Sequence, residues 1–480
     1  MRVFKSIGLY SLSSFIQKSI GFFLLPVYTS VLLPEDYGVI SVVTTIASVL
    51  FTLFTISLPS AITRFYVDYS ENHSKLAIFI STLIYFLVGV NAIALTLMLL
   101  FGENIFYFVL GKIEFYPYMV LALLSVFGQL LYNIALGLLQ IQEKPKEYII
   151  LSLSFVLLNV SCVLYYLLIQ KEGVIGYLLA NLFSSTVFSF ISLWHLRSYL
   201  TFKFDLKMLR SALKYSLPIV PYSVSSYIAT SIDRILLNGI LNAGMVGIYS
   251  IANTLSLPIK IITTSVNMAF VPIYYRACTN NSYREIIEIS KVFIWLYNVM
   301  AITLSLFAYE IVFVFLDPKY LESVIIIPIL AFTFAVYGLY YIFINIFFYE
   351  KRATNNVSII TIISLGLNVI LNLILIPTFD ILGSAFATFF TQVVIAVYAA
   401  VFGKRHEKVS WNYWQFFISY LVSILIGWLP LLFFQSEVSW LIFLMKTVMI
   451  IIAVVLLNFI LWKRIDGPII YYVGKYFKDK

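Results

Sequence analysis

Long apolar stretches recur along almost the whole chain and fix the class of fold that it can adopt. About 20 apolar residues in an α-helix cross the hydrocarbon core of a bilayer, whereas a membrane β-strand needs an alternating segment of about ten. Only 11% of the residues are charged, against about 25% in soluble proteins. We therefore predict an all-α integral membrane protein, in which helices satisfy their own backbone groups within the lipid.

The distribution of lysine and arginine between loops indicates how many spans the chain has and in which direction each one crosses the membrane. With the N-terminus inside, the outer loops contain only Lys112, Lys171 and Lys319, and most other basic residues fall in inner segments. This asymmetry predicts fourteen transmembrane helices with both termini in the cytoplasm. The expected spans are residues 7–33, 38–62, 76–101, 116–139, 149–169, 174–196, 213–238, 245–272, 291–316, 324–348, 357–377, 381–402, 414–434 and 440–462.

Short motifs recur at an offset of about 207 residues. Tyr37–Ser41 returns as Val246–Ser250, Glu143-Lys144 as Glu350-Lys351, and Ile175-Gly176 as Leu382-Gly383. Each copy contains six spans, an even number, so both copies have the same orientation. The pattern predicts two parallel six-helix repeats around a central cavity, with a further C-terminal helix pair outside the repeat.

These boundaries divide the chain into four parts. Residues 1–197 form an N-terminal six-helix bundle, 198–212 a cytoplasmic basic amphipathic linker, 213–403 a C-terminal six-helix bundle, and 404–480 helices 13 and 14 with a basic cytoplasmic tail. In the linker, apolar residues at helical spacing from Phe202 onward alternate with lysine and arginine. This pattern indicates a helix on the inner leaflet that meets anionic lipid, and we expect no nucleic-acid role.

Cations inside the spans mark the candidate binding site, because a charge in a spanning helix costs about 3 kcal/mol and usually faces protein or water. Lys18 and Lys260 lie near mid-depth of helices 1 and 8, and Arg234 lies toward the outer end of helix 7. Arg64 closes the inner end of helix 2, where an ordinary boundary charge is the alternative. We expect these four cations to bind a polyanionic substrate in the cavity.

Three other charges have different expected roles. Asp233 either forms a structural pair with Arg234 or binds a coupling H⁺ or Na⁺. Glu310 is expected at the interface, and Lys446 is expected to extend to the lipid headgroups.

Prolines interrupt three of the spans and predict bends, either static or used in gating. They are Pro26, Pro218, Pro221 and Pro258. The two cysteines, Cys162 and Cys278, match no metal or redox spacing, and the sequence has no GxxxxGK[ST] loop. We therefore predict no catalytic residues, no metal site and no cofactor.

Two segments, Leu24–Val43 and Ser231–Ser256, share a pattern in which a Tyr-Gly or Gly-Ile-Tyr element opens a helix after a short outer turn. In this pattern the chain resembles the Wzx-type polysaccharide-repeat-unit flippases of the multidrug/oligosaccharidyl-lipid/polysaccharide exporter superfamily. The resemblance implies a flippase that moves a polyprenyl-pyrophosphate-linked oligosaccharide from the inner to the outer leaflet of the bacterial cytoplasmic (inner) membrane. It implies alternating access without ATP, and a role in making surface polysaccharide such as capsule or the O-antigen of lipopolysaccharide. Partners in such families include membrane lipids and a polysaccharide polymerase or glycosyltransferases.

Several alternatives remain open at this point. A flippase for a lipid-linked peptidoglycan precursor shares the fourteen-helix plan and a cationic cavity. A MATE-like cation antiporter should have an acidic cavity, whereas the intramembrane charges here are mainly basic. A membrane enzyme such as a polymerase or ligase should carry catalytic residues in a substantial outer loop, and a scaffold protein leaves the charges unexplained.

Overall fold

Helices make up all of the regular structure in the part of the chain that the structure describes. The computed structural model describes residues 13, 16–17, 19–229, 231–350, 355–405, 409–428 and 439–463. Over these residues, ten helices are long and apolar enough to cross a membrane. The chain is thus a multi-pass helical membrane protein, as the apolar stretches predict.

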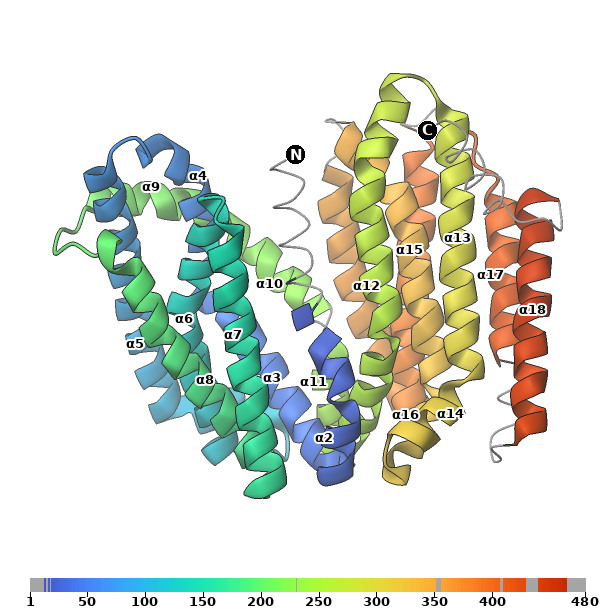
Figure 1. The fold of residues 1–480 in the computed structure, drawn as a ribbon, viewed down its shortest axis with the longest axis horizontal. Coiled ribbons are helices and arrows are strands. Elements are labelled where there is room, and N and C mark those ends of the chain that lie inside the picture. The colour runs from blue at the N-terminus through green and yellow to red at the C-terminus, as the bar shows by residue number, and fades with distance from the viewer. Residues whose placement is uncertain are drawn as a thin grey trace. The chain divides into compact units, whose positions relative to one another are not determined.

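The chain forms two compact units, Met1–Gly247 and Ile248–Lys480. In the first unit, α6 packs against α8, α3 and α5, and α7 packs against α8 (Figure 1). The helices of this unit are α2 (Leu25–Val31), α3 (Pro34–Phe54), α4 (Leu58–Tyr69), α5 (His73–Leu110), α6 (Val120–Ile141), α7 (Pro145–Leu164), α8 (Gly173–Leu196), α9 (Leu206–Ser216), α10 (Val220–Ala229) and α11 (Ile232–Ile240).

The second unit is built around α15. This helix packs against α13 and α16, and α13 also packs against α17 and α18. The helices are α12 (Ala243–Thr279), which begins in the first unit, α13 (Tyr283–Leu306), α14 (Ala308–Phe315), α15 (Ile327–Tyr349), α16 (Asn355–Gly403), α17 (Tyr413–Trp428) and α18 (Trp440–Trp462).

The predicted span 38–62 is bent rather than straight. It ends as α3 at Phe54 and resumes as α4 at Leu58, because Ile56 and Ser57 both have a left-handed backbone with φ of 50°. The side chain of Asn91 on α5 donates a hydrogen bond to the Phe54 carbonyl at 2.9 Å. A helix that ends between other helices leaves carbonyls without partners, and Asn91 satisfies one of them.

The predicted span 213–238 is divided into several pieces. It comprises the end of α9, a 3₁₀ turn over Leu217–Ile219, α10 and α11, with a break around Ser231. All of these pieces pack in the first unit, where α9 contacts α4, and α10 contacts α3. The two packing units therefore meet after Gly247 in the sequence, whereas the second sequence repeat was predicted to begin at residue 213.

The basic linker helix begins later than its pattern predicts. Phe202 lies at a bend outside the helix, which starts at Leu206 after Asp205, whose carboxylate accepts the N–H groups of Lys207 and Met208. The backbone N–H of Asp205 in turn donates to the Thr82 hydroxyl of α5 at 3.1 Å. This contact and the cap fix where the helix can start.

Two glycines from corresponding positions of the sequence repeat contact each other within the first unit. Gly38 on α3 lies against the backbone of Ala243, and Gly247 on α12 lies against the backbone of Pro34. A Cβ atom at either glycine would overlap a carbonyl oxygen of the other helix. Membrane helices associate mainly through close packing at small residues, so these glycines allow α3 and α12 to cross with their backbones in contact.

The glycine crossing predicts a steep cost for a single added methyl group. We expect Gly38→Ala and Gly247→Ala each to lower the free energy of unfolding by about 1–3 kcal/mol, because the overlap is with backbone and cannot relax by a rotamer change. Gly239→Ala in α11 is the matched control, since nothing lies within 4 Å of its Cβ position. Thermal unfolding in detergent measures all three. Equal midpoints for the three variants would contradict the close crossing.

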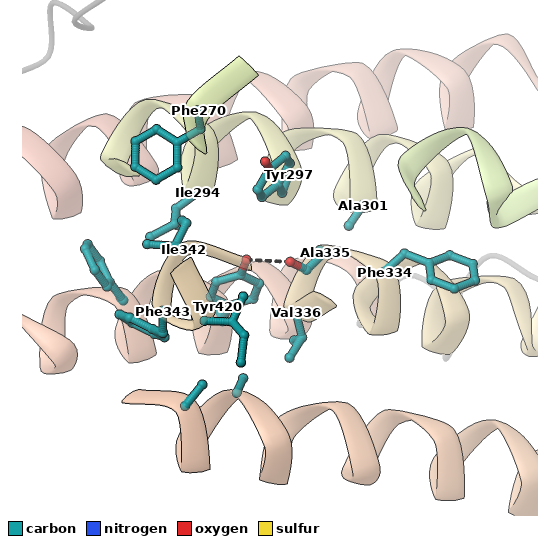
Figure 2. Close-up of a cluster of buried hydrophobic side chains, with 14 of the residues drawn as sticks. Phe270, Ile294, Tyr297, Ala301, Phe334, Ala335, Val336, Ile342, Phe343 and Tyr420 are labelled. Atoms are coloured by element: carbon teal, nitrogen blue, oxygen red, sulfur yellow. Dashed lines mark hydrogen bonds between the residues drawn. The ribbon is translucent and has the colours of Figure 1, made fainter. Parts of the chain in front are cut away.

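The core of the second unit surrounds α15. Figure 2 shows Phe270, Ile294 and Tyr297 above α15, which itself contributes Phe334, Ile342 and Phe343. The buried Tyr420 hydroxyl of α17 donates to the Ala335 carbonyl of α15 at 2.8 Å. Lipid tails are as apolar as the core side chains, so burying those side chains gives little hydrophobic gain. Helix association therefore depends on van der Waals packing and on interhelical hydrogen bonds such as this one.

The helix α16 contains two of the predicted spans, 357–377 and 381–402. Its backbone is non-helical at Asp380, with φ of 51° and ψ of −133°. The Asn368 amide approaches the Thr388 hydroxyl at 3.5 Å, although these residues would lie about 30 Å apart in a straight helix. The segment is therefore a helical hairpin, and Gly383 lies against the Leu375 carbonyl where the two limbs meet.

Candidate functional site

Lys260 lies midway along α12 with aromatic rings of α15 beside it. Its amino group is 5.4 Å from the centre of the Phe334 ring and 6.0 Å from the centre of the Tyr337 ring. These distances allow cation–π attraction, which is stronger where water is excluded. The structure thus gives the predicted cavity lysine an aromatic and hydroxyl-bearing environment within the second unit.

Three tyrosines of α15 extend this environment. The rings of Tyr337, Tyr340 and Tyr341 lie within 4.6–5.7 Å of one another, and the Tyr341 hydroxyl donates to that of Tyr337 at 2.9 Å. Gly338 makes room on the same helix, because a Cβ there would overlap the ring of Tyr297 on α13. These tyrosines were not predicted as site residues, and their spacing at i, i+3 and i+4, which places them on one face of a helix, was the available signal.

Amides on the same two helices pair with each other. Asn345 of α15 donates to the side-chain oxygen of Asn267 on α12 at 3.0 Å. Interhelical pairing is the ordinary role of amides between membrane helices. Together, Lys260, the tyrosines and this amide pair place one cation, several hydroxyls and two amides along one α12–α15 contact.

Arg234 lies on α11 in the first unit, where its guanidinium approaches the Thr45 hydroxyl of α3 at 3.4 Å. Asp233 is buried and accepts the backbone N–H of Arg234 at 2.9 Å in the first turn of α11. A carboxylate at this position also interacts favourably with the positive end of the helix dipole. One helical turn on, Asn238 donates to the Leu110 carbonyl of α5 at 2.8 Å, which holds α11 against the unit.

The other two predicted cations are Arg64 and Lys18. Arg64 forms an exposed ion pair with Asp68 one turn further along α4, with an N–O distance of 3.2 Å. This pairing favours the boundary-charge interpretation of Arg64, and substrate binding by it stays a prediction. Lys18 lies outside the described residues.

The four predicted proline bends have different local settings. Pro26 lies in the first turn of α2, just after an interruption of the helix at Leu24. Pro218 lies in the 3₁₀ turn before α10, and Pro221 lies in the first turn of α10. Pro258 lies inside α12, which continues through it. Three of the four thus coincide with helix starts, and their use in gating stays a prediction.

The clearest charge interaction in the second unit was not predicted. Lys446 of α18 donates to the Glu310 carboxylate of α14 at 2.6 Å, and their side chains are only 3% and 13% exposed. The expectation that the Lys446 side chain extends to the lipid headgroups was wrong, because it is buried against Glu310, whose position at the interface stays a prediction. The two residues are 136 positions apart in the sequence, so no local pattern predicts the pair. The pair forms because either charge alone would be costly between membrane helices.

This buried pair predicts an asymmetric response to mutation. We expect Lys446→Met to lower stability by about 3–5 kcal/mol, because it leaves the Glu310 carboxylate without its partner. The double variant Glu310→Leu/Lys446→Met should recover most of this loss, as measured by thermal unfolding in detergent.

Lys144→Met is the matched control, because Lys144 pairs with Glu147 only at an exposed site and at 3.8 Å. Its expected cost is below about 1 kcal/mol. If Lys446→Met were as stable as this control, the pair would not hold α18 in place.

Comparisons with known proteins agree with this architecture. The family described as "Polysaccharide biosynthesis protein" matches residues 3–278. The capsular polysaccharide biosynthesis protein CapF of Staphylococcus aureus is 25% identical over 387 residues, which cover 78% of this chain and 92% of the relative.

Solved structures with the same fold are transporters. A lipid II flippase, MurJ, in an inward closed conformation aligns with a TM-score of 0.75 at 17% identity, over 95% of this chain and 99% of that chain. An inward-facing multidrug resistance MATE transporter of the MOP superfamily aligns with a TM-score of 0.65 at 17% identity, over 81% and 94%. The chain therefore has the fold of these transporters.

Proposed function

Because the chain belongs to the polysaccharide biosynthesis protein family, we propose that it is a flippase for polyprenyl-pyrophosphate-linked oligosaccharide repeat units. It moves them from the inner to the outer leaflet of the bacterial cytoplasmic membrane, where they supply surface polysaccharide such as capsule or O-antigen. The family and the transporter fold support this proposal.

The observation that carries the proposal is the environment of Lys260. The pyrophosphate and sugar hydroxyls of the substrate cannot enter hydrocarbon without compensation for their lost hydration. A lysine offers a point charge to phosphate oxygens, while tyrosine rings and hydroxyls suit sugar faces and edges. The α12–α15 contact combines these groups around Lys260, Tyr337 and Tyr341.

Arg234 is the second proposed phosphate contact. Its guanidinium has five donors, and its contact to Thr45 uses a neutral hydroxyl, so the arginine keeps its charge and further donors for phosphate oxygens. We include Lys18 as a third contact from helix 1. Asp233 is the candidate for binding a coupling H⁺ or Na⁺, since it is buried beside Arg234.

The proposed transport cycle uses the finer architecture expected from the sequence. Fourteen helices, in two parallel six-helix repeats and a C-terminal pair, surround a central cavity with both chain termini in the cytoplasm. Alternating access would then open the cavity to each side of the membrane in turn. The hairpin in α16 supports two separate spans there.

A flippase for a lipid-linked peptidoglycan precursor is the second candidate, favoured by the fold shared with the lipid II flippase. The repeat-unit substrate is preferred because the family and CapF point to polysaccharide synthesis. A MATE-like cation antiporter is disfavoured, because the intramembrane charges other than the Lys446–Glu310 pair are mainly basic, with Lys18, Arg234 and Lys260 against Asp233.

The proposal predicts a loss of export when the cations are removed. In cells that lack the wild-type copy, we expect Lys260→Ala and Arg234→Ala each to lower surface glycan about ten-fold or more. A charge-assisted hydrogen bond is worth about 1.5–3 kcal/mol, which corresponds to a factor of that size. Lipid-linked oligosaccharide should accumulate in the inner leaflet while the protein level in the membrane stays normal.

Lys319→Ala is the matched control, because Lys319 also lies 6.0 Å from a tyrosine ring but in a predicted outer loop. It should export glycan normally. Normal export by all variants would contradict the cationic site, and an unchanged surface glycan with impaired peptidoglycan synthesis would favour the second candidate.

A further inference from the structure

An apolar cleft of about 650 Å³ opens on the surface of the second unit. Its floor is formed by α15, and its two walls are the end of α16 with the next residue (389–404) and residues 413–424 of α17. Val397 and Phe417 are each 55% exposed at its mouth, whereas Phe343 and Phe416 are almost completely buried. The cleft is therefore deep enough to take a ligand between two membrane helices.

This cleft is separate from the Lys260 environment. Val336, Leu339 and Phe343 face the cleft from α15. Phe334 and Tyr337, which flank Lys260, lie on the opposite side of that helix, because successive residues turn by about 100°. A ligand in the cleft would thus occupy the other face of α15.

The lining of the cleft selects for hydrocarbon. The tyrosine hydroxyls near it already donate to backbone carbonyls, Tyr413 to Ala400 and Tyr420 to Ala335. Among the lining residues, Lys404 is the only charged one, and it follows the last turn of α16 at the same end as Tyr413. The volume lies within the range of about 300–1,000 Å³ that is typical of ligand pockets.

We propose that the cleft binds a hydrocarbon chain of an anionic membrane phospholipid, with the phosphate beside Lys404. The helices around the cleft are membrane helices, so lipid is the solvent that reaches its mouth. One lysine matches the single negative charge of a phosphodiester, and basic residues at the inner face attract anionic lipids. A pyrophosphate-linked sugar carries more charge and many hydroxyls, for which this cleft has no partners.

The charge contact is tested by lipid binding to the purified full-length protein in detergent. Native mass spectrometry would compare palmitoyl-oleoyl phosphatidylglycerol with the zwitterionic phosphatidylcholine of the same chains. We expect Lys404→Gln to weaken phosphatidylglycerol binding about five-fold, the effect of about one basic residue near a membrane surface, and to leave phosphatidylcholine binding unchanged. Arg405→Gln is the matched control, since Arg405 is the next residue and does not line the cleft.

The apolar contact is tested by closing the mouth of the cleft. Val397→Trp should remove phosphatidylglycerol retention, whereas Val394→Trp should not, because Val394 is exposed on α16 but lies outside the cleft. The proposal is overturned if Lys404→Gln and Arg405→Gln bind phosphatidylglycerol alike, or if Val397→Trp retains it fully. It is also overturned if a polyprenyl phosphate binds through Lys404 and phosphatidylglycerol does not.

Discussion

Polar side chains between membrane helices need partners from the protein, because the surrounding hydrocarbon offers none. This constraint organises both units. Asn91 completes the end of α3, Asn238 holds α11, and Glu310 neutralises Lys446. Lys260 lies beside aromatic rings of α15, which offer it cation–π attraction, whereas Lys446 forms an ion pair with a carboxylate.

The sequence predicted the features that depend on local pattern. Apolar length identified the membrane helices, and the repeat picked out Gly38 and Gly247, whose mutual contact explains why both copies need glycine. Features that depend on residues far apart in the sequence could not be predicted from it. Lys446 and Glu310 are 136 residues apart. The helix break at Ile56 and Ser57 has no glycine or proline at the bend itself that would have predicted it.

The candidate site was predictable only in part for the same reason. A lysine in an apolar span is visible in sequence, so Lys260 could be identified, but the rings beside it come from α15. Arg64 looked similar in sequence and instead forms an exposed pair with Asp68. Helix α15 emerges as the central element of the second unit, with the Lys260 environment on one face and an apolar cleft on the other.

Flipping by the purified protein tests the central claim most directly. Proteoliposomes would contain a fluorescent polyprenyl-pyrophosphate oligosaccharide in both leaflets, and a membrane-impermeant reagent that destroys the label would report the fraction exposed outside. The account predicts that active protein raises this fraction from about half toward all of the label, while about half of a labelled phosphatidylcholine stays protected. If the oligosaccharide lipid remains half protected with correctly folded protein present, the chain is not a flippase for this class of substrate.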